Sequence, residues 1–386
     1  MRRTVTGLLA LATTASLVMT ACGSSSKGGS ASGTSTTTNS SGSGKVAVGV
    51  ILPDTTSSTR YTLYDAPQLK AAFDAAGIKS DIQNAGGSTA KASQIADAMV
   101  GEGVKVILLD SIDATNGAAI ESKAQAAGIK VIDYDRVNLG GTAPYYVSFD
   151  NELVGKLQAQ TMMTCLGSKA NPQIIEMDGG KDVDNNAILF AKGAASVLDP
   201  LQSAGKVKVV SKTTVKGWDK NLAAPDFTQA LTANGGKVDA VLAANDDIAN
   251  EVITVLKNKG LQVPVTGQDA GVSGLQNILK GDQCMTVFKD VKKESSAASV
   301  LAIALIKGQT PASAGLTTTP FADPKTPSHK ISAVLLTPQV ITKGNVGAVV
   351  KAGALTPAQI CKGIESLCAS AGITSGSGST TTTSSN

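Results

Sequence analysis

Short apolar runs alternate with amphipathic stretches along most of this chain. Residues 104–109 form a continuous apolar run of strand length, which is typical of a strand covered on both faces of a parallel sheet. Residues 91–100 place Ile95 and Met99 on one helical face, so they predict a helix that packs against such a sheet. The alternation of strand and helix then continues to about residue 336.

The pattern predicts ten strands and eight helices. The strands are expected at 46–52, 104–109, 129–133, 145–149, 173–177, 207–210, 239–244, 263–267, 285–288 and 331–336, and the helices at 69–76, 91–100, 118–127, 151–165, 187–198, 247–259, 272–280 and 294–307. Repeated βα units imply an α/β fold with helices on both faces of parallel sheets. So many strands exceed the needs of one such domain, so we expect two Rossmann-like lobes.

Polar residues follow the predicted strands at their carboxyl ends, in both halves of the chain. They are Asp54, Asp110, Asp135, Arg136, Asp178, Asn245, Asp246, Gln268 and Asp269. In open parallel sheets, ligands bind in the crevice outside these ends. Strand ends also meet water, and loops are polar for that reason alone. The recurrence in both halves favours a ligand cleft between two lobes.

The N-terminus predicts export and lipid anchoring. Arg2 and Arg3 precede an apolar run at 5–18, and the small residue Ala21 directly precedes Cys22. We expect a lipoprotein signal peptide at 1–21 and lipidation of Cys22, which gives an extracytoplasmic protein anchored to the cell membrane. An ordinary secretory signal with an incidental cysteine is the alternative. Residues 22–44 are rich in Ser, Gly and Thr and predict a flexible tether, and 373–386 predict a disordered tail.

The four other cysteines suit an exported protein with disulfides. They allow three pairings, of which we favour Cys361 with Cys368 and Cys165 with Cys284. A metal site is the weaker interpretation, because no C-x-x-C occurs and the chain has one histidine, His329. The net charge is +4, and no basic run with interleaved aromatic residues predicts a nucleic-acid partner.

Motifs for catalysis are missing from the sequence. It has neither a phosphate-binding glycine loop nor an H-E-x-x-H or G-x-S-x-G motif. Residues 182–186 begin like a calcium loop, but Ala187 and Gly193 stand where that loop needs glycine and glutamate. We therefore expect no catalytic residue, no metal and no cofactor.

A set of polar side chains suits a ligand rich in hydroxyl groups. Carboxylates accept hydrogen bonds from sugar hydroxyls, Arg and Lys donate, and an aromatic ring covers the apolar face of a pyranose. The candidates are Arg60, Tyr61, Asp135, Arg136, Asp184, Asn186, Trp218, Asn245, Asp269 and Lys289. Each has a structural alternative: Asp184 could cap the following helix, Asp135 and Arg136 could pair at the surface, Trp218 could be core, and Lys289 could be solvated.

These residues lie in motifs that closely resemble those of periplasmic D-xylose-binding proteins. The motifs are Tyr134-Asp135-Arg136, residues 146–152, residues 183–187, Gly217-Trp218, residues 231–234, Asn245-Asp246, residues 267–270 and residues 285–289. The resemblance implies a type I periplasmic-binding fold, with three crossover strands near 148–150, 289–291 and 335–337. It also implies that eight candidates contact sugar, with Trp218 as a stacking ring; the eight are Arg60, Asp135, Arg136, Asp184, Asn186, Asn245, Asp269 and Lys289. Tyr61 stands where the family commonly has tryptophan, and residues 55–59 lack the charged pattern of the family.

The resemblance implies a function as the capture component of an ABC importer. A monosaccharide, D-xylose above all, would close the cleft and then be delivered to the permease and ATPase subunits by a monomeric protein. The lobes would comprise 45–148 with 290–335, and 149–289 with 336–372. Glucose or ribose as ligand, a sensor that feeds a chemoreceptor or kinase, and an enzyme on this fold are the alternatives. A cytoplasmic repressor of the same fold would carry a helix-turn-helix in place of the signal peptide.

Overall fold

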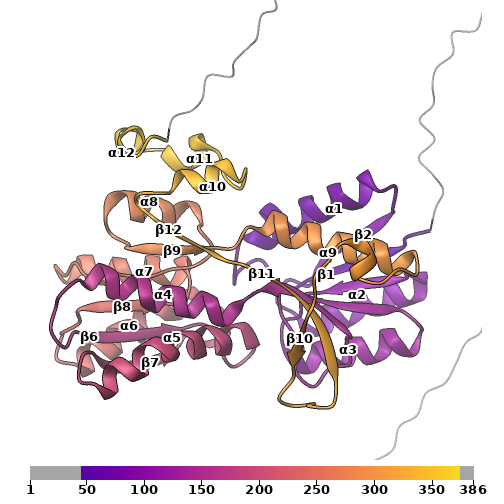
Figure 1. The fold of residues 1–386 in the computed structure, drawn as a ribbon, viewed down its shortest axis with the longest axis horizontal. Coiled ribbons are helices and arrows are strands. Elements are labelled where there is room, and N and C mark those ends of the chain that lie inside the picture. Colours follow the sequence, from indigo (N-terminus) through magenta and orange to yellow (C-terminus); the bar gives the residue numbers. More distant parts are fainter. Residues whose placement is uncertain (1–44, 374–386) are drawn as a thin grey trace, which may run out of the picture. The chain divides into compact units, whose positions relative to one another are not determined.

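A computed structural model describes residues 45–373 of the chain (Figure 1). The predicted signal peptide, the tether with Cys22, and residues 374–386 lie outside the described residues. Within 45–373, no helix combines the length and apolarity that crossing a membrane requires.

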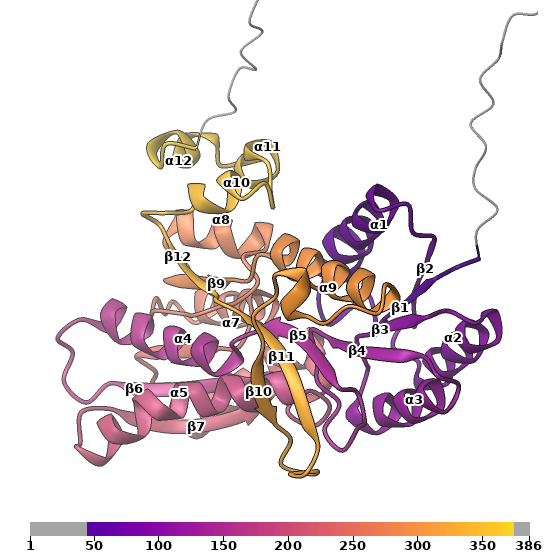
Figure 2. The ribbon, with the colours of Figure 1, turned by 45° about the vertical axis from the view of Figure 1, so that its right-hand side comes forward.

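A seven-stranded sheet is built from both ends of the described chain. Its order is β10-β11-β5-β4-β3-β1-β2, and only β10 is antiparallel to its neighbour. The strands are β1 (Val48–Leu52), β2 (Ser80–Asn84), β3 (Val106–Leu109), β4 (Lys130–Tyr134), β5 (Tyr145–Phe149), β10 (Thr319–Ala322) and β11 (Lys330–Leu336). Figure 2 shows β10 and β11 running together beside β5.

Helices cover both faces of this sheet, as its apolar central strands require. The helices are α1 (Ala66–Ala75), α2 (Thr89–Glu102), α3 (Ala114–Ala126) and α9 (Val291–Ile306). Val50 and Leu108 face α1 and α9, whereas Ile51 and Ile107 face α2 and α3. Every residue of β1 and β3 is buried as a result. We call this sheet with its four helices the large-sheet half.

A second sheet follows the order β7-β6-β8, with strands β6 (Gln173–Asp178), β7 (Lys208–Thr214) and β8 (Ala240–Ala243). Single parallel bridges from Val241 to Val265 and from Gln268 to Val287 extend it to the antiparallel pair β9 (Met285–Phe288) and β12 (Gln339–Thr342). The helices α4 (Asn151–Leu166) and α5 (Asn185–Ser203) cover one face, and α6 (Lys220–Ala233) and α7 (Asp246–Asn258) cover the other.

Four more helices complete this second part, which we call the small-sheet half. They are α8 (Val272–Lys280), α10 (Gly347–Lys351), α11 (Pro357–Cys361) and α12 (Glu365–Ser370), and they share one apolar cluster with Phe288 and Ile341. The cluster also holds Ile373, the last described residue. Two disulfides lie in this half, Cys165 with Cys284 and Cys361 with Cys368, which is the favoured pairing.

The chain passes between the halves three times. It leaves the large sheet after β5 and enters α4, returns between β9 and α9, and leaves again between β11 and β12. These passages lie at 149–151, 288–291 and 336–339, which are the places that the family resemblance implied.

The structure departs from the predicted elements in a few places. Residues 263–267 make only the single bridge at Val265, so the expected strand there does not form. Strands β2, β10 and β12 and helices α6, α10, α11 and α12 were not predicted. A five-residue π-helical turn, η1 (Tyr61–Asp65), also precedes α1. Such turns are often found at functional sites.

Candidate functional site

One pocket gathers all ten candidate ligand-binding residues. The large-sheet half supplies Arg60, Tyr61, Asp135 and Arg136, and the small-sheet half supplies Asp184, Asn186, Trp218, Asn245 and Asp269; Lys289 stands on the passage between β9 and α9. They meet because each follows the carboxyl end of a strand, or opens the helix after it, and these ends lie at one edge of each sheet. Ser57, Ser58, Phe190 and Gln268 complete the lining.

Arg60 is held by three carboxylates in the large-sheet half. Its guanidinium donates to Asp65 at 2.8 and 2.9 Å and to Asp135 at 3.0 Å, and it also pairs with Glu294 of α9. All of these side chains are buried, and Tyr134 donates a further hydrogen bond to Asp65. Most donors of Arg60 are therefore engaged within the protein, so its main effect is to fix the position and charge of Asp135.

Arg136 and Tyr61 form a second buried group on the same side. Arg136 donates to the carbonyl oxygen of Ser111 at 3.1 Å and to the hydroxyls of Ser57 and Tyr61 at 3.2 Å each. Tyr61 donates in turn to Asp135 Oδ2 at 3.2 Å. The Tyr61 ring also lies near both guanidinium groups, at 5.6 Å from that of Arg60 and 5.9 Å from that of Arg136.

Asp135 stays ionised in spite of its burial. Desolvation by itself would raise the pKa of this carboxyl, but the charges of Arg60, Lys289 and Arg136 outweigh it and lower the pKa to about 2. A buried carboxylate that keeps its charge is a strong acceptor for hydroxyl groups.

Lys289 joins the two halves of the pocket electrostatically. Its ammonium lies 3.9 Å from Asp135 and 3.7 Å from Asp269, and 5.6 Å from the centre of the Phe190 ring. The side chain is 6% exposed, so Lys289 is not the solvated lysine of the structural alternative. Asp269 is more open, with 23% of its side chain exposed, and a ligand can reach it.

Trp218 lies at the small-sheet side of the pocket with little freedom to move. Its indole Nε1 donates to Asp184 Oδ2 at 3.1 Å, and Phe190 meets the ring edge-on at 6.3 Å between ring centres. Gly179 passes directly under the ring, and a Cβ at this residue would overlap three atoms of the indole. Trp218 is therefore packed against its neighbours, as a core residue is, and it also lines the pocket, as a stacking ring for sugar would.

Three of the pocket residues also stabilise the fold through their own hydrogen bonds: Asp184, Asn186 and Asn245. Asp184 caps α5 by accepting from Asn186 N at 2.8 Å, and Asn245 caps α7 by accepting from Ile248 N at 2.9 Å. Asp184 Oδ2 also lies 3.4 Å from Arg136 Nε. Asn186 donates to the carbonyl oxygen of Asp135 at 2.9 Å, a hydrogen bond between the two halves.

Three pocket residues adopt the left-handed backbone region that non-glycine residues rarely occupy. They are Asp135 with φ 60°, Trp218 with φ 61° and Asp269 with φ 92°, and Ala270 follows with φ 52°. Such conformations cost free energy of order 1–3 kcal/mol each and cluster at functional sites. The surrounding contacts hold these side chains toward one another at that cost.

Several buried side chains have acceptor atoms without a hydrogen-bond partner among the described residues, and two of them, Gln268 and Asp110, lie in or next to the pocket. Gln268 Oε1 is one, and this residue lines the pocket; both carboxylate oxygens of Asp110 are the others, with Arg136 Nε 3.7 Å from Asp110 Oδ1. Of the side chains with such an acceptor, Gln268 is the one that lines this pocket. Gln268 can therefore accept from a ligand that enters the pocket.

Sequence reasoning missed several residues of this site. Gln268 was named as a polar residue after a predicted strand but not as a ligand candidate, and Phe190 lies three residues after the motif at 183–187. Asp65 and Glu294 gave no signal, because an isolated charged residue, whether before a predicted helix or at its start, is usually solvated. Their burial depends on Arg60, which a local pattern does not show.

The assembled groups suit a neutral ligand with several hydroxyls. Carboxylates, guanidinium groups, amides and an ammonium alternate around one small space, and an indole and a phenyl ring close one side. The charged side chains of the pocket already form ion pairs with one another. The pocket therefore offers a ligand directed hydrogen-bond donors and acceptors but little net charge.

Comparison with known proteins supports this interpretation. A family model described as a periplasmic binding protein domain matches residues 48–310. The D-xylose-binding periplasmic protein of Escherichia coli is 35% identical over 272 residues, which cover 70% of this chain and 79% of that protein. A multiple sugar-binding periplasmic receptor of Rhizobium radiobacter is 34% identical over 329 residues, which cover 80% of this chain and 90% of the receptor.

A solved structure shows the same fold. It is a carbohydrate transporter solute binding protein from Chloroflexus aurantiacus in complex with D-glucose. It superposes with a TM-score of 0.74 at 30% identity, and the match covers 81% of this chain and 98% of that one.

Proposed function

This chain belongs to the periplasmic binding protein domain family, and on that premise we propose that it captures a monosaccharide outside the cytoplasm, with D-xylose as the favoured ligand. The predicted type I periplasmic-binding fold is confirmed by the family and by the solved structures. Members of this family are solute-binding proteins, and the proposed activity involves no covalent step.

One observation carries the proposal: ten residues chosen for sugar chemistry line a single pocket with their charges paired. Asp135, Asp184, Asn245, Gln268 and Asp269 supply acceptors, and Arg136, Asn186 and Lys289 supply donors. Trp218 and Phe190 supply aromatic surface for the C–H groups of the ring. We assign Gln268 as an additional ligand residue, because its buried Oε1 has no partner among the described residues.

Closure of the cleft would couple sugar binding to a change from an open to a closed conformation. Asp135 belongs to one half and Asp269 to the other, so a sugar that contacts both stabilises the closed form by its differential affinity. The moving lobes would be 45–148 with 290–335 and 149–289 with 336–372. The three passages between the halves would serve as hinges.

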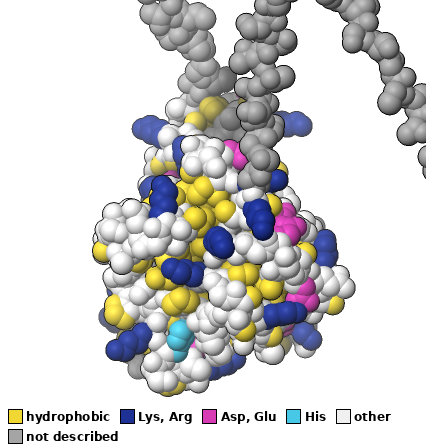
Figure 3. Space-filling view, turned by 90° about the vertical axis from the view of Figure 1, so that its right-hand side faces the viewer, with side chains coloured by type: hydrophobic (Ala, Val, Ile, Leu, Met, Phe, Trp, Pro, Cys, Tyr) yellow, Lys and Arg dark blue, Asp and Glu magenta, His cyan; other side chains and the backbone are white. Residues whose placement is uncertain are grey.

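The partners follow from the family and from the sequence. A permease and an ATPase of an ABC importer would receive the sugar from a monomer that Cys22 anchors to the membrane. On the face shown in Figure 3, Lys and Arg side chains stand among uncharged residues instead of gathering in one patch. This distribution gives no support for a nucleic-acid partner.

A calorimetric panel of sugars tests the proposal. Titration with D-xylose, D-glucose, D-ribose and an amino acid should give saturable one-site binding of at least one sugar, with D-xylose tightest. Binding of the amino acid but of no pentose or hexose would overturn the sugar assignment. Tighter binding of D-glucose than of D-xylose would support sugar capture and would make D-glucose the favoured ligand.

A second candidate function uses the same pocket. The Rhizobium radiobacter relative is named a receptor, which favours a sensor that presents bound sugar to a chemoreceptor or kinase. Deleting the gene separates the two roles: loss of sugar uptake supports the importer component, and loss of a sugar response with uptake intact supports the sensor.

A further inference from the structure

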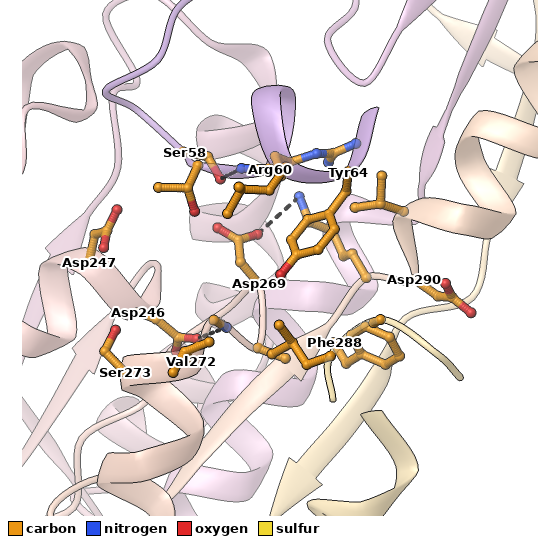
Figure 4. Close-up of a pocket in the computed structure, with 18 of the residues that line it drawn as sticks. Ser58, Arg60, Tyr64, Asp246, Asp247, Asp269, Val272, Ser273, Phe288 and Asp290 are labelled. Atoms are coloured by element: carbon orange, nitrogen blue, oxygen red, sulfur yellow. Dashed lines mark hydrogen bonds and ion pairs between the residues drawn. The ribbon is translucent and has the colours of Figure 1, made fainter. Parts of the chain in front are cut away.

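A second cavity adjoins the sugar pocket and has a different character. It has a volume of about 390 Å³, within the usual range of small-molecule sites. Ser58, Arg60, Asp269 and Lys289 line both spaces, so the cavity begins where the polar pocket ends. In Figure 4, Tyr64 reaches toward it from η1, and Asp269 and Phe288 approach from the other half.

The walls beyond these shared residues are largely apolar. Leu63 and Tyr64 come from η1, Val272 from α8, Phe288 from β9, and Leu355 from the segment after α10. Leu63 is 60% exposed, an unusual position for a large apolar side chain beside a polar cleft. Ala270, Val291 and Ala354 extend the same surface.

Polar side chains line the cavity together with these apolar ones. Asp247, Ser273, Asp290 and Lys292 line the cavity with Gln68 and Gln276. Asp246 also lines it, but its carboxyl group accepts hydrogen bonds from Gly271 N at 2.9 Å and from Gln283 Nε2 at 2.8 Å. The cavity thus offers more aliphatic contact area than the pocket beside it, where the apolar surface is aromatic.

We propose that this cavity is a subsite for an apolar substituent on the bound sugar, so that the protein also takes glycosides with an alkyl or aryl aglycone. The inference rests on the proposed function, because the sugar ring must occupy the polar pocket. A substituent on the sugar oxygen next to Asp269 and Lys289 enters the cavity and buries apolar surface against Leu63, Phe288 and Leu355. That burial contributes about 25 cal/mol per Å² of apolar area.

Calorimetry with D-xylose and with phenyl α- and β-D-xyloside tests the subsite. Both anomers are needed because the structure does not define which oxygen faces the cavity. We expect one xyloside to bind at least as tightly as D-xylose and to compete with it for a single site. In Leu63→Asp, its affinity should fall at least fivefold while the affinity for D-xylose stays within twofold.

Ile188→Asp is the matched control, because Ile188 is also an exposed apolar residue, at 44%, but lines neither space. It should change neither affinity. Binding of D-xylose with exclusion of both xylosides would overturn the subsite and leave the proposed function intact. An equal loss for both ligands in Leu63→Asp would also overturn it. Failure of every free sugar would remove the proposed function and the subsite together.

Discussion

Asp269 is the pocket carboxylate that a ligand reaches most easily. It has a left-handed backbone, lies 3.7 Å from Lys289 and remains partly exposed. Asp135, in contrast, is enclosed by Arg60, Tyr61 and Lys289. We therefore propose different roles for the two carboxylates: Asp135 organises the pocket, and Asp269 accepts a hydrogen bond from the ligand.

Replacing Asp269 with alanine should weaken sugar binding by about 10- to 100-fold, since a hydrogen bond to a charged group contributes about 1.5–3 kcal/mol. The thermal midpoint of the free protein should change little, because Asp269 is partly exposed. Asp226→Ala on α6, outside both spaces, is the control. Unchanged affinity in Asp269→Ala, measured by calorimetry, would remove this residue from the site.

Gly179 should be needed for the position of Trp218. In Gly179→Ala the new methyl group overlaps the indole, so the ring must tilt away from Asp184 and Phe190. We expect sugar affinity to fall at least tenfold, and tryptophan fluorescence to shift because this is the only tryptophan. Gly347→Ala, where a Cβ meets nothing within 4 Å, should leave both properties as they are.

At the scale of elements, two glycines let α4 and α5 cross in close contact. A Cβ on Gly155 would overlap the backbone of Phe190, and a Cβ on Gly193 would overlap that of Glu152. The close approach matters for the site, because α5 begins at Asn185 and presents Asn186 to the pocket.

Gly193→Ala should therefore lower the free energy of unfolding by several kcal/mol, as overpacking of a rigid contact does. Gly101→Ala is the opposite case: Gly101 lies within α2, and a Cβ there meets nothing within 4 Å. It should raise stability by up to about 1 kcal/mol through helix propensity. Urea denaturation of both variants gives the comparison, and equal effects would contradict the role of Gly193.

The N-terminus of α7 should make stability depend on pH. Burial raises the pKa of Asp246 to about 8, and the charge of Asp269 adds to this, so the folded protein holds a proton that the unfolded chain releases near pH 4. The folded state then binds more protons between these values, and the free energy of unfolding falls as pH rises from about 4 to 8. One such group contributes a slope of at most about 1.4 kcal/mol per pH unit.

Asp246→Asn should reduce this slope, measured by urea denaturation at pH 5 to 9. Glu102→Gln, at the exposed end of α2, should leave it unchanged. Glu294, whose pKa burial raises to about 8, adds a slope of the same sign in both variants. An unaltered slope in Asp246→Asn would show that this carboxyl is ionised throughout the range.

The sequence predicts elements well where the pattern of apolar residues is clear. Residues 145–149, 272–280 and 285–288 form the expected elements to the residue, because an apolar run or a sharp amphipathic period marks each. Strand β2 was missed because Ser80–Asn84 is a half-buried edge strand with one apolar residue, Ile82. Helix α6 was missed because Pro225 interrupts its pattern.

The site was predictable to the extent that parallel strands end at one edge. That rule places Asp135 at one edge of the large sheet, and Asn245 and Asp269 at one edge of the second sheet, and the expectation of a cleft between two lobes brings the two edges together. It does not reveal which side chains form hydrogen bonds or ion pairs with one another. Arg60 pairs with Asp65 and Glu294 because α1 and α9 pack on one face of the large sheet. These two helices are far apart in the sequence, so a local pattern does not show that they meet.

At the scale of the whole molecule, two disulfides close loops of very different length. Cys165 and Cys284 are 119 residues apart, and Cys361 and Cys368 are seven apart. Chain entropy alone predicts stabilisation of roughly 5 kcal/mol for the long loop and roughly 2 kcal/mol for the short one.

The double variant Cys165→Ser/Cys284→Ser should therefore lose more stability than Cys361→Ser/Cys368→Ser. Thermal unfolding of both variants in parallel measures the difference, and thiol titration of the parent protein checks that the bonds are present. A larger loss for the short loop would show that packing around α11 and α12, and not loop entropy, sets the contribution.

The three passages between the halves also constrain how the protein is made. The large sheet pairs β5 with β11, and it is covered on one face by α9, so it needs residues that follow almost the entire small-sheet half in the chain. A polypeptide that emerges N-terminus first from a ribosome or a translocation pore lacks these parts until residue 336 has appeared. The pairing of β5 with β11 therefore cannot form before this point, and completion of the large sheet is a late event of biogenesis.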